Sequence, residues 1–289
     1  MSARNRGIDW VRGLRGTPPS GRGPALIGMV HLRPLPGAPR FEGRLSDVVD
    51  AAVREASALR RAGFDAIMVE NFGDVPFYKS SLPPETIAAL TRCALAVREE
   101  TGDLPLGINA LRNDGHTALA IAAVVEGAFI RVNVLTGAML TDQGLIEGEA
   151  ASILRRRAAL APHVAIIADV FVKHATPLAQ SMGPDGVDLR QLAQVAIDTA
   201  LRGGADALIV SGSGTGSATD PVRLAVVRQA VTEVPVLVGS GTTTASLGAL
   251  LADGFIIGTA LKVGSEVDEE RARMFVSARD ALARAHSVG

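Results

Sequence analysis

Pro235-Val-Leu-Val-Gly-Ser-Gly241 and Asp253-Gly-Phe-Ile-Ile-Gly-Thr259 are two short aliphatic runs, and each ends in glycine beside a hydroxyl residue. The start of the second run has counterparts upstream, at Ala-Gly-Phe-Asp-Ala (62–66), Glu-Gly-Ala-Phe-Ile (126–130) and Gly-Gly-Ala-Asp-Ala (203–207). A recurring segment of this kind indicates that one supersecondary unit is repeated along the chain. We therefore expect these runs to be equivalent strands of one sheet.

Eight apolar runs alternate with longer amphipathic segments, which is typical of repeated βα units. The runs are Ala25–His31, Ala66–Glu70, Pro105–Asn109, Phe129–Asn133, Val164–Val170, Ala207–Val210, Pro235–Gly239 and Gly254–Ile257. With 289 residues the chain has the length of one large α/β barrel plus extensions. An open, doubly wound sheet is the alternative. The unbroken pattern favours an α/β fold of the (β/α)8 TIM barrel type.

The segments between the runs have helical spacing and helix boundaries. One face of the first helical segment is Val49, Ala52, Val53, Ala56 and Leu59, and one face of the last is Met274, Phe275, Ala278, Leu282 and Ala285. Asp220-Pro221 has the sequence of an N-cap followed by proline at the first helical position. Gly63 and Gly204 stand where a helix would end in a left-handed residue.

Composition excludes several classes of protein. A formal net charge of −1 argues against a nucleic-acid binder that works by neutralising phosphates. The one cysteine, Cys93, rules out an internal disulfide and a cysteine-based zinc site, and we expect a small buried residue in a cytoplasmic protein. Glu126, Asp169 and Asp253 interrupt the most apolar windows, so we expect no integral membrane segment.

The first residues differ from the rest of the chain. Residues 1–23 carry five arginines and several glycines and prolines, without the apolar stretch of a secretory signal. We interpret them as an extension that is flexible or packs on the barrel or on a neighbouring subunit of a homo-oligomer. Residues 24–289 are expected to form one barrel domain.

Polar side chains gather at the C-terminal end of the predicted strands, where the active sites of such barrels lie. They are His31, Glu70, Asn71, Asp74, Asn109, Arg112, Asn113, Arg131, Asn133, Asp142, Asp169, Lys173 and His174. Arg112 and Arg131 suit carboxylate or phosphate groups. His31 and His174 suit general bases or metal ligands. Because no His-x-x-His spacing or acidic cluster accompanies them, we predict no metal site and no resident cofactor, while a divalent ion stays open.

The sharpest local motif is Gly239-Ser240-Gly241, paired with Gly258-Thr259 after the last strand. Glycine lets several backbone N–H groups approach one anion, and the loops after strands seven and eight are the usual phosphate site of this architecture. The alternative is that these glycines only form tight turns. Ser211-Gly-Ser-Gly-Thr-Gly216 is not a dinucleotide fingerprint. It is either a ligand-covering extension of the anion site, through Ser211 and Gly212, or a plain turn.

Asp169 lies inside an otherwise apolar strand, so its carboxylate needs a partner or a raised pKa. It is either an acid–base residue or a structural aspartate held by an arginine or lysine. Lys173 is either a Schiff-base nucleophile or an anion clamp. Adjacent strand residues point to opposite faces, so Lys173 and His174 share the site only if the chain leaves the strand there.

Several segments resemble the BtpA family, also called BtpA/SgcQ, and the resemblance extends from Ala25 to about Arg273. They are 29–37, 70–77, 107–114, 129–133, 141–148, 168–175 and 238–241, beginning with Met29-Val-His-Leu-Arg-Pro-Leu-Pro-Gly37. The resemblance implies a barrel of the phosphate-binding type. One member is named for photosystem I biogenesis, and others sit among sugar-metabolism genes. Phe171 departs from the family, which implies a polar residue there, and the stretch between Lys262 and Val267 is shortened.

We predict an isomerase, lyase or aldolase-like enzyme acting on a small phosphorylated metabolite such as a sugar phosphate. Catalysis is assigned to Glu70, Asn109, Asp169, Lys173 and His174, and substrate binding to His31, Asn71, Arg112, Asn113, Arg131 and Asn133. Phosphate binding is assigned to Ser211, Gly212, Gly239, Ser240, Gly241, Gly258 and Thr259. The alternative is a non-catalytic biogenesis or stability factor for photosystem I or another membrane complex.

Overall fold

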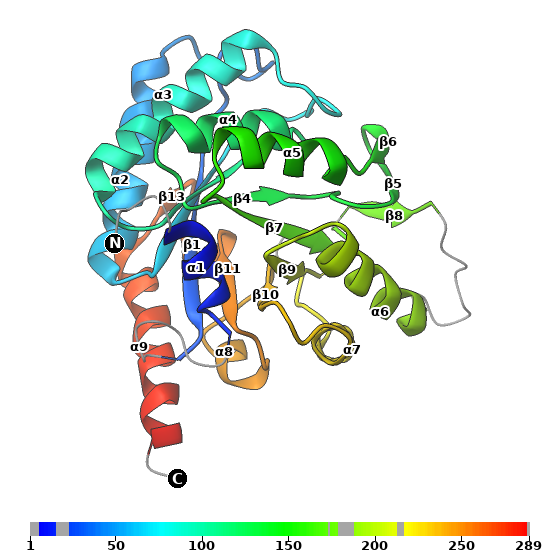
Figure 1. Cartoon of the computed structure of the whole chain (residues 1–289). Helices are drawn as coiled ribbons and strands as arrows, with labels where there is room; N and C mark the ends of the chain where they lie inside the picture. Colours follow the sequence, from blue (N-terminus) through cyan, green and yellow to red (C-terminus); the bar gives the residue numbers. More distant parts are fainter. Residues whose placement is uncertain (1–5, 16–22, 173, 179–187, 213–216, 288–289) are drawn as a thin grey trace.

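Eight parallel strands close into a barrel at the centre of the molecule (Figure 1). The computed structural model describes residues 6–15, 23–172, 174–178, 188–212 and 217–287. In the order in which they are hydrogen-bonded, the strands are β1 (Ala25–His31), β11 (Gly254–Ile257), β10 (Val236–Val238), β9 (Ala207–Val210), β7 (Ala165–Val170), β4 (Phe129–Val132), β3 (Leu106–Asn109) and β2 (Ala66–Glu70). This closed parallel sheet confirms the predicted TIM barrel. Each of its strands falls within one of the apolar runs.

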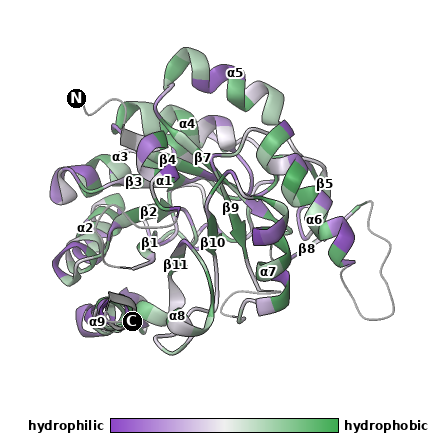
Figure 2. Ribbon diagram, turned by 60° about the horizontal axis from the view of Figure 1, so that its bottom comes forward, coloured by the Kyte–Doolittle hydropathy of each residue, from purple (hydrophilic) through white to green (hydrophobic). Residues whose placement is uncertain are grey.

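Helices surround the barrel, with apolar residues turned toward the strands (Figure 2). They are α2 (Leu45–Ala62), α3 (Pro84–Thr101), α4 (Gly115–Val124), α5 (Ala150–Leu160), α6 (Leu189–Ile197) with the π-helical turn η2 (Asp198–Arg202), α7 (Pro221–Ala230), α8 (Ser246–Ala249) and α9 (Glu269–Ser287). Asp220 caps α7 through the N–H of Val222, and Gly63 ends α2 with φ 94°. Met274 is 57% exposed, so the predicted face of α9 was wrong there. No helix in the described ranges is long and apolar enough to cross a bilayer.

The N-terminal extension closes the barrel at the end opposite the predicted site. Helix α1 (Arg6–Arg12) contacts β4 and β7, and Trp10 stacks on Phe129 with ring centroids 5.6 Å apart. Val11 and Leu14 are buried within the cluster of apolar side chains that fills the barrel interior. These contacts make the described part of the extension a component of the core.

Leu14→Ala should therefore destabilise the protein, by about 2–3 kcal/mol, the lower half of the range for leucine truncations in cores. The value lies low in that range because a short terminal segment can shift to fill part of the cavity. Urea unfolding followed by the fluorescence of Trp10, the one tryptophan of the chain, would measure the change. A loss below about 0.5 kcal/mol, the scale of surface substitutions, would show that the extension adds nothing to the core.

The repeated segments that precede the strands form a structural device at the same end of the barrel. An aspartate immediately before a strand accepts a hydrogen bond from the backbone N–H of a residue in the preceding strand: Asp65 from Leu26, Asp206 from Ile166 and Asp253 from Val236, at 2.8–2.9 Å. An arginine donates to the same carboxylate oxygen: Arg279 to Asp65, Arg157 to Asp206 and Arg228 to Asp253. Three of the four repeated segments thus contain a strand-to-strand clamp, whereas 126–130 has no aspartate.

Asp206→Ala should cost about 1–3 kcal/mol, because it leaves the buried N–H of Ile166 without its acceptor. The carboxylate is 2% exposed, whereas its arginine partners are more exposed, Arg157 at 18% and Arg12 at 64%. Chemical denaturation would measure the loss. Because this clamp lies at the far end of the barrel from the predicted site, ligand-induced stabilisation should be unchanged, and a lost ligand response would contradict its purely structural role.

Two small sheets lie outside the barrel and were not predicted. Strands β5 (Ala138–Thr141) and β6 (Gly144–Glu147) form a hairpin in the loop after β4, and β8 (Ala175–Pro177) pairs with β5. The second is the hairpin of β12 (Lys262–Val263) and β13 (Glu266–Val267), beyond the 3-10 turn η3 (Thr259–Leu261). The first sheet joins the loops that follow β4 and β7, so it forms part of the end of the barrel where the site is expected.

Cys93 is buried in α3, as the sequence predicted. Burial raises the pKa of its thiol to about 12. The side chain therefore stays protonated at neutral pH and packs as a small apolar residue.

Candidate active site

The side chains inside the barrel change from apolar to polar at the C-terminal ends of the strands. Because alternate residues of a strand face the same side, the inward positions can be followed along each strand. Met68, Phe129 and Ile167 belong to the apolar interior cluster. Two residues further along the same strands are Glu70, Arg131 and Asp169, all buried. The last layer of the interior is therefore charged, in a position where packing alone would favour aliphatic residues.

Arg131 and Asp169 form a buried ion pair in this layer. The Nε and Nη2 atoms of Arg131 donate to the two carboxylate oxygens of Asp169 at 2.9 and 2.8 Å, and their side chains are 3% and 0% exposed. Asn133 Nδ2 donates to the same carboxylate at 2.8 Å, and Ser211 Oγ at 3.4 Å. Burial alone would lower the pKa of Arg131, but the charge and hydrogen bonds of Asp169 outweigh it and raise that pKa. This geometry fits the alternative in which Asp169 is held by an arginine.

Glu70 lies beside this pair with other donors around it. Asn109 Nδ2 donates to Glu70 Oε2, and His31 Nε2 is 3.7 Å from Glu70 Oε1. The imidazole of His31 stacks on Phe72, with ring centroids 4.4 Å apart and planes 21° apart. Glu70 and His31 thus form a carboxylate–imidazole pair whose two groups are oriented by neighbours, an arrangement able to accept and return a proton.

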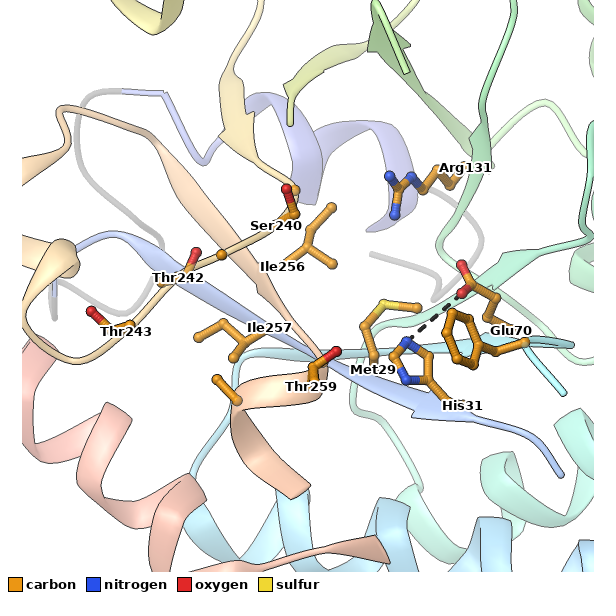
Figure 3. A pocket seen from close by; sticks show the side chains of 15 residues that line it. Met29, His31, Glu70, Arg131, Ser240, Thr242, Thr243, Ile256, Ile257 and Thr259 are labelled. Atoms are coloured by element: carbon orange, nitrogen blue, oxygen red, sulfur yellow. Dashed lines mark ion pairs between the residues drawn. The ribbon is translucent and has the colours of Figure 1, made fainter. Parts of the chain in front are cut away.

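A cavity of about 220 Å³ separates the His31–Glu70 pair from the loops after β10 and β11 (Figure 3). We call it the glycine cavity. Gly239 to Thr243 and Ile256 to Ala260 line one side, and Met29, His31, Glu70, Phe72 and Arg131 line the other. A Cβ atom at Gly258 would lie 2.6 Å from His31 Cε1, and one at Gly239 would lie 2.5 Å from Ser211 Oγ. Both glycines therefore allow close approaches that no other residue permits.

Several residues that line this cavity have backbone N–H groups without an acceptor in the part of the chain that the structure describes. Among the described residues, no acceptor contacts the backbone N–H groups of the following five residues: Ser240, Gly241, Thr242, Thr259 and Ala260. The N–H groups on either side of Ser240 to Thr242 do have acceptors. The N–H of Gly239 donates to Val210 O at 2.9 Å, and the N–H of Thr243 donates to Ser246 Oγ at 2.8 Å. A set of unused donors on a cavity wall with a nearby guanidinium is suited to an anion.

A second cavity, of about 360 Å³, adjoins the first across Glu70, Phe72 and Arg131, which line both. We call it the arginine cavity. Its other polar lining residues are Asn109, Arg112, Asn133, Asp142 and His174. Its apolar lining residues are Val75, Phe77 and Leu111, together with Phe72. Arg112 is 6% exposed, and burial lowers the pKa of its guanidinium. The two cavities together form one elongated site with Glu70 and Arg131 near its middle.

Asn71 and Asn113 line neither cavity, although the sequence placed them in substrate binding. Asn71 accepts the N–H of Leu111 at 2.7 Å and donates to Asp74. Asn113 accepts from and donates to the backbone of Val134 at 2.8 and 3.0 Å. Both side chains tie one strand-end loop to its neighbour. Asn71 is one residue out of the inward phase of β2, and Asn113 lies four residues beyond the end of β3, where the chain has left the strand.

The loop after β9 also differs in part from expectation. Ser211 Oγ points to Asp169, and the N–H of Gly212 donates to Ser240 Oγ at 2.8 Å, so neither residue lines the two cavities. The described part of this loop supports the loop after β10. Residues 213–216 and Lys173 lie outside the described residues, whereas His174 lines the arginine cavity with φ 57°.

Several lining residues were not predicted. Phe72, Phe77 and Leu111 supply the apolar wall, and Thr242 extends the glycine-rich turn. Phe72, Phe77 and Leu111 lie in the segments 70–77 and 107–114 that carry the family resemblance, but no role was assigned to them. A search for polar side chains passes over aromatic residues in such loops.

Phe171, which departs from the family pattern, lies away from both cavities. Phe171 packs in the core between barrel and helices, so its departure from the family pattern removes no side chain from either cavity. Among the described residues, no group of three or more His, Cys, Asp or Glu side chains is arranged to hold a metal ion.

Comparisons with known proteins give one family and one fold. A match to the BtpA family covers residues 22–281. An uncharacterized protein of Thermococcus kodakarensis is 48% identical over 257 residues, covering 87% of this chain and 93% of the relative. The photosystem I biogenesis protein BtpA of Synechocystis is 43% identical over 259 residues, covering 88% and 87%.

Solved structures share the barrel at low sequence identity. The N-(5'-phosphoribosyl)anthranilate isomerase of Pyrococcus furiosus has a TM-score of 0.56 and 11% identity, covering 89% of this chain and 98% of that one. KGPDC from Streptococcus mutans has a TM-score of 0.56 and 14% identity, covering 90% and 99%. Likeness at this identity establishes the fold alone.

Proposed function

The chain belongs to the BtpA family, and we propose that it is a cytoplasmic enzyme that carries out acid–base chemistry on a small phosphorylated metabolite such as a sugar phosphate. One observation carries the proposal. Residues whose backbone N–H groups have no acceptor among the described residues line a cavity, and the His31–Glu70 pair lines its other side. An anion held by those N–H groups would place the remainder of its molecule against the carboxylate and the imidazole.

The anion is proposed to be a phosphate. The loops after β10 and β11 supply the N–H groups of Ser240 to Thr242 and of Thr259 and Ala260. Arg131, whose raised pKa keeps it charged, lines the same cavity. Fixed amide dipoles and a guanidinium together favour a doubly charged oxyanion, and this end of a barrel is where phosphates commonly bind. Two relatives in fold are named for phosphoribosylanthranilate isomerase and KGPDC, which is consistent with this proposal.

Proton transfer is assigned to Glu70 and His31. Glu70 would accept a proton from a substrate carbon next to a carbonyl group, and Arg131 would stabilise the negative charge that develops on the carbonyl oxygen. Return of the proton to a neighbouring position gives an isomerase, and departure of a neighbouring group gives a lyase. Asp169 is proposed to position Arg131, because both of its oxygens are already engaged. His174 lies at the arginine cavity and is kept as a second proton carrier.

A role in the biogenesis of a membrane complex is the second candidate, favoured by the name of the Synechocystis relative. An assembly role would act through the surface and gives no reason for a charged, buried layer at the end of the barrel. The two candidates differ in their response to small ligands, because only the enzyme requires the cavities to be occupied.

Thermal unfolding with inorganic phosphate and a panel of sugar phosphates tests the proposal. A ligand at a hundred-fold excess over its Kd should stabilise the protein by about 2.7 kcal/mol, and the unphosphorylated sugars should not. Thr259→Asp places a carboxylate in the cavity at an exposed position and should abolish the response, while Thr259→Ser should keep it. No shift with any phosphorylated compound, or an equal shift in Thr259→Asp, would refute phosphate binding.

A further inference from the structure

The arginine cavity gives the site a second end that the phosphate does not occupy. It shares Glu70, Phe72 and Arg131 with the glycine cavity, so a ligand with its phosphate among the N–H groups would extend past Glu70 into it. Its volume of about 360 Å³ is larger than the 220 Å³ of the glycine cavity. The chemistry of this second end therefore bears on which phosphorylated compound the protein accepts.

Arg112 is the principal cationic group of the arginine cavity. Its side chain is 6% exposed, and its backbone N–H donates to Tyr78 O at 3.0 Å, which anchors the loop that carries it. Asn109 and Asn133 line the same cavity, and so do the apolar residues Phe77 and Leu111. A cavity lined by a guanidinium, amides and apolar side chains fits a short carbon chain that ends in a planar anion.

The carboxylates near Arg112 already have other donors. Asp169 accepts from Arg131 and Asn133, and Glu70 accepts from Asn109. Asp142, at the turn between β5 and β6, accepts from Gln143 at 2.6 Å. Burial is the largest influence on Arg112 and lowers the pKa of its guanidinium despite these acids.

We propose that the arginine cavity binds a carboxylate, so that the substrate is a phosphorylated carboxylic acid with its phosphate in the glycine cavity. The inference rests on the proposed function and narrows its substrate class from phosphorylated metabolites in general to sugar acids and related hydroxy or oxo acids. The reacting carbon then lies between the two anionic ends, beside Glu70. Two anionic anchors would fix the position of that carbon relative to the carboxylate.

Binding of matched compounds tests this inference. Dissociation constants would be measured by calorimetry at constant ionic strength for 6-phosphogluconate against sorbitol 6-phosphate, and for 3-phosphoglycerate against glycerol 3-phosphate. In each pair only the first compound carries a carboxylate. We expect at least one of the two acids to bind tenfold or more tightly than its partner. In Arg112→Gln this difference should shrink to less than threefold, while the alcohol phosphates keep their affinity.

Two further variants separate local from general effects. Arg156→Gln removes a positive charge at an exposed position of α5 and should leave both affinities unchanged. Arg112→Lys retains the charge without the planar guanidinium group, and the difference in affinity between acid and alcohol phosphates should be intermediate. This variant still tests the inference if Arg112→Gln does not fold. Equal binding of acids and alcohols, with both bound, overturns the carboxylate site and leaves the phosphate site standing. If no phosphorylated compound binds, both proposals fail.

Discussion

Replacing Asp169 by asparagine is expected to lower the free energy of unfolding by about 3–5 kcal/mol, because it leaves the buried guanidinium of Arg131 without its counter-charge. The two side chains are 0% and 3% exposed, so water cannot take over the role of the carboxylate. Urea unfolding followed by circular dichroism would measure the loss. A change below about 1 kcal/mol, within the range of exposed ion pairs, would contradict the description of this pair as buried and interdependent.

The double variant Asp169→Asn with Arg131→Met is the matched control. Removing both charges should recover most of the stability, since buried ion pairs can often be replaced by apolar residues at little cost. The double variant should nevertheless bind phosphate more weakly than the natural protein, because Arg131 lines the glycine cavity. The double variant would then be more stable than Asp169→Asn and would bind phosphate more weakly than the natural protein. This combination is expected when a charge is retained for function. A double variant no more stable than Asp169→Asn would show that the pair is not the source of the loss.

The barrel could be predicted because its strands are buried on both faces. Such strands appear as continuous aliphatic runs, and the runs at 25–31, 66–70 and 254–257 have the bounds of β1, β2 and β11. The repeated segments before the strands added a second signal. In two of them, 62–66 and 203–207, its physical cause is the clamp in which Asp65 and Asp206 each bind the preceding strand.

The site could be predicted only in part, because position at a strand end does not determine the direction of a side chain. Glu70 and Asn109 continue the inward phase of their strands and line the cavities, whereas Asn71 is out of that phase and holds a loop. Asn113 lies beyond the end of β3, where strand alternation no longer applies, and it also holds a loop. Following the period of two from Met68 to Glu70 would have distinguished Glu70 from Asn71.

Long-range pairing explains what the sequence did not indicate. Strand β8 joins β5 across a wide separation in the chain, and its three residues carry no pattern of their own. The N-terminal extension reads as polar because of its arginines, yet Val11 and Leu14 reach the barrel interior. In both segments the residues that make the contact form too short a run to show a hydrophobic period. Their conformation therefore depends on the segment against which they pack.

Thr259→Pro is expected to weaken the binding of inorganic phosphate by about 10- to 100-fold. The substitution deletes one backbone N–H, and a hydrogen bond to a charged group is worth about 1.5–3 kcal/mol. Thr259 is the first residue of the 3-10 turn, and no protein acceptor takes its N–H in the described ranges. Proline is common at the first position of a helical turn, and Gly258 before it has no Cβ to clash with the proline ring. The ψ angle of Gly258, −87°, must turn toward the extended region that precedes proline, a change that glycine makes more easily than any other residue.

Thr259→Ala supplies the comparison, because it removes the same hydroxyl and keeps the N–H. Thermal unfolding without ligand should show both variants folded, and calorimetric titration with phosphate should then place Thr259→Pro at least tenfold below Thr259→Ala. The difference isolates one amide dipole, which no side-chain truncation can do. Equal affinities in the two variants would mean that the amide does not contact the anion. The phosphate would then be held by Arg131 and side chains alone, and the glycines would serve only the close packing of the loops around His31 and Ser211.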